Sequence, residues 1–279
     1  MRAAERSFSP NKVLYSRNEN VSNRVLLYGN RGLNLLFVPG WASTEYTWRN
    51  FIPYLSKNYI VHYFETREKP NTRYQDRNVD LSLDSMSNDL VTYANSISGL
   101  SFVAGASLGA STIINGWKNI AIKPRKLALI CPNLGIRLPK LFSVWEKAPR
   151  SVLKAARPAI LWGISKFSYG YDGDRVAGML RAFRIAEIDV LLRSAKQLAN
   201  LRLPSELISK IDVPALVIGT LQDEIHNLND AIKVAKEIKT SKWETLPTFG
   251  DAHSSRSARL LELWFTPNAA NSQLASDPS

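Results

Sequence analysis

The stretch that decides the fold lies in the first half of the chain and reads Ser101-Phe102-Val103-Ala104-Gly105-Ala106-Ser107-Leu108-Gly109-Ala110. The apolar residues before Gly105 predict a strand, and the run from Ala110 to Lys118 predicts a helix. A Gly-x-Ser-x-Gly pattern between a strand and a helix is typical of a nucleophile elbow, a tight turn that exposes a serine hydroxyl. The residues two positions before and after the serine, Gly105 and Gly109, are glycine because the turn leaves no room there for side chains. The alternative interpretation is a Gly- and Ser-containing turn of an ordinary strand–helix unit.

Further strand-then-helix units surround this turn. Apolar runs with strand character occur at 21–28, 33–38, 59–64, 126–132, 213–219 and 243–246. Helical patterns occur at 44–55, 82–98, 110–118, 228–238 and 255–265. Because consecutive strands joined by helices run parallel, the sequence predicts an α/β protein with a mostly parallel central sheet and helices on both faces.

The alternation of strands and helices stops between residues 133 and 204. This segment has no strand-like run, and we expect helices separated by Pro139, Pro149, Pro158 and a turn at 169–173. It holds 13 Lys and Arg against 5 Asp and Glu, so eight charges of the net +12 lie here, interleaved with aromatic residues. We therefore expect 133–204 to be a helical lid inserted into a core of 1–132 and 205–270, followed by a frayed tail at 271–279.

The charge balance of 36 basic and 24 acidic residues suggests anionic partners. The basic lid would suit an anionic substrate, an acidic acyl carrier or an anionic membrane surface, and it would equally suit a solvated helical surface. Nucleic acid is not expected, because the chain has no zinc-finger spacing, Walker loop or RNA-binding signature. Charge does not indicate the oligomeric state.

The compartment is inferred from the first residues and from the single cysteine. Residues 1–17 are polar and charged without an apolar segment, and no apolar run approaches the length of a membrane span. Cys131 follows a strand-like run and has no second cysteine with which to pair. We expect a cytoplasmic protein in which Cys131 is a buried free thiol.

A serine hydroxyl becomes a strong nucleophile when a base accepts its proton and a third group orients that base. Asp223 and His253 each follow a predicted strand, so they should lie at the same sheet edge as Ser107. Of the other two histidines, His62 lies inside a strand, where packing is the simpler role, and His226 lies in a loop expected at the surface. We expect neither a cofactor nor a metal ion.

In this order and placement, Ser107, Asp223 and His253 resemble the catalytic triad of the α/β-hydrolase family. The resemblance spans about residues 21–266 and is closest to small lid-bearing carboxylesterases of the pimeloyl-carrier-protein methyl esterase type. It rests on the segments 36–41, 46–48, 105–109, 217–223 and 250–253. It implies that Ser107 is the nucleophile, His253 the general base and Asp223 its orienting acid. It also implies an oxyanion hole formed by the backbone N–H groups of Trp41 and Leu108.

The chain departs from this family in three places. Pro39-Gly40 stands where the family usually has His-Gly, which should change the hydrogen bonding of the oxyanion loop. The segment 65–70 replaces a Gly-rich turn and should leave a charged loop on the substrate side. Ala252 rather than Gly precedes His253. In addition, Glu224 and Asp251 compete with Asp223 as the acid of the triad.

The resemblance implies a serine hydrolase that cleaves a carboxylic ester through an acyl-enzyme intermediate. Two alternatives stay open: a thioesterase that acts on acyl groups carried by coenzyme A or a carrier protein, and a non-catalytic ligand-binding protein on the same scaffold. The same triad also supports lactone opening, perhydrolysis and carbon–carbon hydrolysis. The identity of the substrate and the length of its acyl chain therefore do not follow from the sequence.

Overall fold

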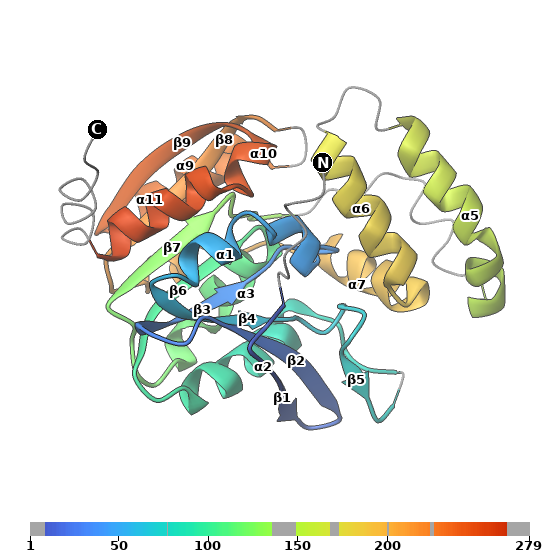
Figure 1. Ribbon diagram of the computed structural model, residues 1–279, viewed down its shortest axis with the longest axis horizontal. Coiled ribbons are helices and arrows are strands. Elements are labelled where there is room, and N and C mark those ends of the chain that lie inside the picture. Colours follow the sequence, from blue (N-terminus) through green and yellow to red (C-terminus); the bar gives the residue numbers. More distant parts are fainter. Residues whose placement is uncertain are drawn as a thin grey trace.

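The protein is built around one mixed sheet, seen in a computed structural model that describes residues 9–76, 78–135, 149–167, 173–199, 201–223 and 226–266 (Figure 1). The strand order is β1-β2-β4-β3-β6-β7-β8-β9, with β5 paired to β2. Strands from β4 to β9 pair in parallel, whereas β1, β2 and β5 pair antiparallel. The strands are β1 Lys12–Asn18, β2 Val21–Tyr28, β3 Leu33–Val38, β4 Tyr59–Phe64, β5 Arg73–Tyr74, β6 Leu100–Ala106, β7 Lys126–Ile130, β8 Ala215–Gln222 and β9 Ser241–Thr248.

Helices cover both faces of this sheet, as the sequence predicts (Figure 1). One face packs against α2 (Leu83–Ser96), α3 (Leu108–Gly116), α8 (Ser205–Ile208) and α9 (Leu228–Glu237). The other face packs against α1 (Ile52–Leu55), α10 (Phe249–Ala252) and α11 (Ser255–Phe265). Because β6 and β7 are buried on both faces, their side chains are almost all apolar, which is the pattern that made them recognisable.

The predicted helix over 44–55 is wrong in its continuity. A 3₁₀ helix, η1, spans Glu45–Trp48 after the N-cap Thr44, and α1 starts again at Ile52. Pro53 is the second residue of α1 and has no N–H to donate to the preceding turn, so an uninterrupted helix cannot form there. A second 3₁₀ turn, η2 (Trp117–Asn119), extends α3. The edge strand β1 was missed because its side chains are mostly polar and exposed or half-buried.

Three helices, α5 (Arg150–Phe167), α6 (Gly173–Ile185) and α7 (Ile188–Ala199), occupy the predicted lid segment and lie to one side of the sheet (Figure 1). Pro158 does not separate helices, contrary to prediction, but lies exposed inside α5. The expected turn at 169–173 falls mostly outside the described residues, as do Pro139 and the tail 271–279. Among the described helices, none is both long enough and apolar enough to cross a bilayer.

The inserted helices α6 and α7 pack on the loop that follows β3. Phe183, Ala186 and Leu191 form a buried cluster with half-buried side chains that include Trp41 and Ala42. The indole Nε1 of Trp41 also donates to Ser194 Oγ of α7 over 2.9 Å. The inserted helices are therefore joined to the carboxyl edge of the sheet at the loop where the sequence placed an oxyanion donor.

Candidate active site

Ser107 occupies a strained turn at the carboxyl end of β6. Its backbone has φ 52° and ψ −116°, a left-handed conformation that a residue other than glycine adopts only under constraint. The Ser107 N–H donates to the carbonyl of Ile130 on β7 over 2.9 Å, which holds the turn in place. The structure thus gives Ser107 the backbone strain expected of a nucleophile elbow.

The glycines beside Ser107 are required by close packing. A Cβ on Gly109 would lie 2.0 Å from the carbonyl oxygen of Val38, so only glycine lets α3 approach β3. A Cβ on Gly105 would lie 2.5 Å from Ile113 Cδ1 and would also meet the backbone of α3. Both contacts show why the strand, the turn and the helix can pack so tightly.

Asn133, which the sequence did not single out, contacts the serine directly. Its Nδ2 donates to Ser107 Oγ over 3.2 Å, and its own carbonyl accepts from Ser111 Oγ over 2.6 Å. Because Asn133 fills an acceptor site on the hydroxyl oxygen, the hydroxyl proton can still be given to a base. In the sequence, the only feature that could have pointed to Asn133 as a site residue is its position just after the buried strand β7.

The loop after β3 lies against Ser107. A Cβ on Gly40 would lie 3.2 Å from Ser107 Cβ and 3.7 Å from Ser107 Oγ, so the loop backbone passes directly beside the hydroxyl. The next residue, Trp41, and Leu108, the first residue of α3, carry the two predicted oxyanion donors. The N–H of Leu108 is one of the first four backbone N–H groups of α3, which have no acceptor within the helix. These groups lie at the N-terminus, the positive end of the helix dipole.

His253 caps α10 and is fixed by three contacts. Its Nδ1 lies 2.8 Å from the carbonyl oxygen of Phe249, and its ring packs on the rings of Phe249 and Trp48, with centroids 4.0 and 4.4 Å apart. A carbonyl oxygen can only accept a hydrogen bond, so Nδ1 carries the proton, and in the neutral ring Nε2 does not. This is the tautomer that a general base needs.

Asp223 follows β8, and its carboxylate is completely buried. It accepts hydrogen bonds from Thr220 Oγ1 over 3.0 Å and from the His226 N–H over 3.2 Å, and its Oδ2 lies 2.7 Å from His226 Nδ1. His226 is only 9% exposed, so the expectation that it lies at the surface is wrong. The imidazole thus adds to the hydrogen bonds that compensate the buried carboxylate for its lost hydration.

The described contacts pair each member of the predicted triad with another residue: Asn133 with Ser107, Phe249 with His253 and His226 with Asp223. The residues nevertheless share one edge, since Trp48 packs on His253 and donates from Nε1 to Ser43 in the loop that touches Ser107. Catalytic hydrogen bonds often form only when substrate binds.

Cys131, Asp223 and His226 also form a cluster whose ligand-type atoms all lie within 4.8 Å of one another. Cys131 is a free, buried thiol, as expected, and burial raises its pKa to about 12. Asp223 Oδ2 and His226 Nδ1 are 2.7 Å apart, closer than two ligands of one tetrahedral zinc ion, which lie about 3.3 Å apart at metal–ligand distances near 2.0 Å. The geometry is that of a hydrogen-bonded network.

Asp251, one of the two residues that compete for the acid role, has a structural function. Its carboxylate accepts from the Thr248 N–H and from Thr248 Oγ1, over 3.1 and 2.8 Å, and so forms a capping box at the start of α10. It thereby holds the helix that carries His253. The other competitor, Glu224, lies outside the described residues.

The segment 65–69 is buried, which corrects the prediction of a charged loop on the substrate side. Each ionic side chain in it has an opposite charge beside it: Glu65 pairs with Arg24, Arg67 with Asp89 and Glu68 with Lys69. Burial raises the pKa of Glu65, and the Arg24 guanidinium opposes that shift. The charges point inward because tertiary partners on β2 and α2 reach them, and sequence alone does not reveal such partners.

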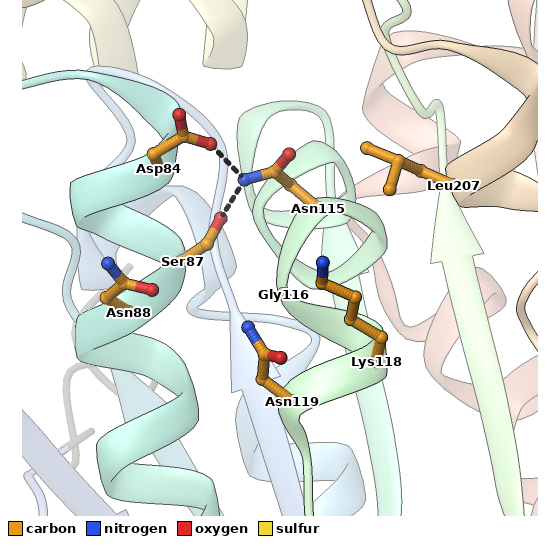
Figure 2. Close-up of a pocket in the computed structure, with 8 residues that line it drawn as sticks. All are labelled: Asp84, Ser87, Asn88, Asn115, Gly116, Lys118, Asn119 and Leu207. Carbon is orange, nitrogen blue, oxygen red and sulfur yellow. Dashed lines mark hydrogen bonds between the residues drawn. The ribbon is translucent and has the colours of Figure 1, made fainter.

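A pocket of about 250 Å³ lies between α2 and α3, away from Ser107 (Figure 2). Its lining is polar and includes Lys118 and Asn119, beyond the far end of α3. Asn115 points across it and donates from Nδ2 to Asp84 and Ser87, as Figure 2 shows. Since Ser107 precedes the first turn of α3, this pocket belongs to the opposite end of the helix and not to the candidate active site.

Comparison with known proteins gives structural matches alone. No protein-family model matches the chain, and no curated protein matches it in sequence. Among solved structures, an esterase from Thermogutta terrifontis is 15% identical with a TM-score of 0.71, and the match covers 91% of this chain and 97% of that one. An enol-lactonase from Burkholderia xenovorans LB400 is 15% identical with a TM-score of 0.71, over 90% and 98% of the two chains.

A serine hydrolase involved in carbazole degradation is 18% identical with a TM-score of 0.68, over 91% of this chain and 98% of that one. At such low identities a likeness establishes the fold and not the activity. The strand order, the parallel pairing from β4 to β9 and the inserted helices agree with these matches. The chain therefore has the α/β-hydrolase fold, with an inserted helical region.

Proposed function

We propose that this protein is a serine hydrolase that cleaves a carboxylic ester through an acyl-enzyme formed on Ser107. The observation that carries the proposal is the strained backbone of Ser107 at φ 52°, beside the Gly40 loop and the N-terminus of α3. Such strain persists only where the surrounding structure enforces it, and it clusters at functional sites. The structural matches include an esterase and a serine hydrolase, which supports this class of reaction.

In the proposed reaction, Ser107 Oγ attacks the ester carbonyl carbon and its proton passes to His253 Nε2. The carbonyl oxygen becomes an oxyanion and accepts hydrogen bonds from the N–H groups of Trp41 and Leu108. Collapse breaks the bond to the alcohol, which takes the proton from His253. Water then attacks the acyl-enzyme with His253 again as the base, and the acid and Ser107 are released.

Asp223 keeps its proposed role as the acid that stabilises the imidazolium of His253. Phe249 already fixes the tautomer of His253 through its carbonyl, so Asp223 would contribute mainly its negative charge. That role requires His253 to approach the buried carboxylate when substrate binds.

A fluorophosphonate probe tests the proposal, because it reacts covalently with an activated serine. We expect labelling of the wild type at neutral pH and none of Ser107→Ala. His253→Ala should be labelled more slowly than the wild type, since it keeps the serine but lacks the base. If the folded wild type is not labelled, Ser107 is not an activated nucleophile and the proposal is wrong.

The ligand-binding alternative is favoured by one observation, that the Asp223 carboxylate lies 2.7 Å from the Nδ1 of His226, a histidine without a role in the proposed reaction. The same labelling experiment separates it from the enzyme. A panel of p-nitrophenyl esters of increasing acyl length, assayed beside acyl-coenzyme A and acyl-carrier thioesters, separates ester from thioester hydrolysis. We expect faster turnover of the esters, and the acyl length preferred in that panel would test the proposed likeness to carrier-protein methyl esterases.

A further inference from the structure

Lys69 is a buried cation that contacts the loop after β3 directly. Its side chain is 1% exposed, and its Nζ donates to the carbonyl oxygen of Gly40 over 2.5 Å. The Glu68 carboxylate, which is 0% exposed, lies 2.7 Å from the same Nζ. Lys69 and Gly40 meet because β4 and β3 are parallel neighbours, so the loops that follow them leave the same edge of the sheet.

The bond to Gly40 acts on the predicted oxyanion donor through one peptide group. The carbonyl of Gly40 and the N–H of Trp41 belong to the same planar unit, and in a trans peptide they point in opposite directions. An ammonium on the carbonyl therefore fixes where the Trp41 N–H points. It also draws electron density toward the oxygen, which makes the N–H a stronger donor.

We propose that Lys69 is a positioning residue that orients and polarises the Gly40–Trp41 peptide, so that the Trp41 N–H stabilises the oxyanion. The inference rests on the proposed hydrolase function and deepens it. Burial makes the effect of the charge larger than at a surface, because little water screens it. Glu68 balances the charge of Lys69 without contacting Gly40 in the described structure, so the positive end of the ion pair faces the loop.

A loss of this effect should appear in kcat and not in KM, because an oxyanion exists only in the transition state. The test variant is Glu68→Gln with Lys69→Met, which removes both charges and so leaves no unpaired buried ion. We expect kcat to fall about 10- to 100-fold, which is less than the loss of a whole oxyanion donor, with KM within about threefold. The affinity for a trifluoromethyl ketone, which forms an oxyanion adduct, should fall by the same factor as kcat/KM.

Lys126→Met is a matched control. Lys126 Nζ also donates to a carbonyl, that of Trp264 over 2.6 Å, but it begins β7 at the end of the strand away from Ser107. Its kcat and ketone affinity should stay near those of the wild type. If the double variant does not fold, Lys69→Arg and Lys69→Gln make the same comparison, since both keep a donor and only arginine keeps the cation; arginine should then be the more active.

Three results would overturn the inference: an unchanged kcat, a rise in KM alone, or a fall in kcat without a matching fall in ketone affinity. Each of these can occur in an enzyme whose Ser107 is fully labelled by the fluorophosphonate. A wild type that is neither labelled nor active would instead refute the proposed function, and the role of Lys69 with it. The two failures are therefore distinguishable.

Discussion

His253 takes its orientation from the main chain of the short helix that carries it. The carbonyl of Phe249 holds Nδ1, while the side chain of Asp251 caps the same helix at its first turn. In a Ser-His-Asp triad the carboxylate usually both fixes the tautomer and stabilises the imidazolium. Here the first task is done by a neutral carbonyl, and Asp223 is bonded to His226.

Because Phe249 and not Asp223 fixes the tautomer of His253, we expect the loss of the Asp223 carboxylate to have a moderate effect on kcat. Asp223→Asn should lower kcat by about 100-fold, less than the roughly 10⁴-fold loss seen where the carboxylate also sets the tautomer. His226→Ala should lower kcat by less than about threefold, because His226 has no proposed part in proton transfer. Steady-state rates with one p-nitrophenyl ester decide this. Equal losses in the two variants would mean that the Asp223–His226 pair acts as a unit and that the acid has been assigned wrongly.

The individual site residues differ in how far sequence could predict them. Ser107, Asp223 and His253 follow strands, and strand ends can be read from local apolar runs. Asn133 contacts Ser107 and Lys69 contacts Gly40, and both contacts depend on how loops of different strands meet. The polarity of the segment 65–69 was visible, but its burial was not, because the partners Arg24 and Asp89 lie on other elements.

Among the helices, α5 has an exposed face that no described element covers. Val152, Ala155, Ala159 and Trp162 follow one another at helical spacing along it, and Val152 and Trp162 are 47% and 62% exposed. Lys154 and Lys166 are exposed beside this stripe. Figure 1 shows α5 at the outer side of the lid, away from the sheet. An apolar stripe flanked by lysines is complementary to an anionic membrane surface, whose lipid chains take up apolar side chains and whose headgroups attract cations.

We therefore expect the protein to bind vesicles that contain phosphatidylserine and to bind pure phosphatidylcholine vesicles much less. Sedimentation should show weaker binding at high salt, because each lysine near the surface contributes about 1 kcal/mol of screened attraction. Trp162→Ala should bind several-fold less, whereas Ile122→Ala, which trims a side chain that is 68% exposed outside the lid, should bind as the wild type does. Equal binding by both variants, or none to either vesicle, contradicts a docking role for α5. If the protein binds an acidic acyl carrier protein and no vesicles, the exposed face of α5 is a docking site for that carrier and not for a membrane.

At the scale of the whole molecule, the sheet is held together by polar contacts as well as by its two apolar cores. His62 on β4 is 8% exposed and bridges two other elements, with Nδ1 2.7 Å from Tyr93 Oη of α2 and Nε2 3.1 Å from Asn34 Oδ1 of β3. The packing role predicted for it agrees with these contacts. Burial lowers the pKa of His62 from 6.5 to about 4.

That shift makes the fold sensitive to acid. The unfolded chain binds a proton near pH 6.5 and the folded chain only near pH 4, so stability is fully present above pH 6.5 and is lost as the pH falls toward 4. The difference between a pKa of 6.5 and one of about 4 corresponds to a loss of about 3 kcal/mol of stability. Urea unfolding of His62→Gln between pH 7 and 4 should show a smaller decline than the wild type, although its stability at pH 7 is lower. Parallel declines would show that other groups cause the acid sensitivity.

Trp41 joins two parts of the molecule that are separated by more than a hundred residues of sequence. Its backbone belongs to the loop beside Ser107, and its indole is bonded to Ser194 and packs edge-to-face on Phe183, with ring centroids 6.1 Å apart. A shift of α6 or α7 would therefore move the Trp41 peptide, which is the proposed oxyanion donor. If the proposed hydrolase function holds, a bulky acyl group that displaces these helices would misalign that peptide, so one side chain would couple the width of the accepted substrate to the rate of turnover.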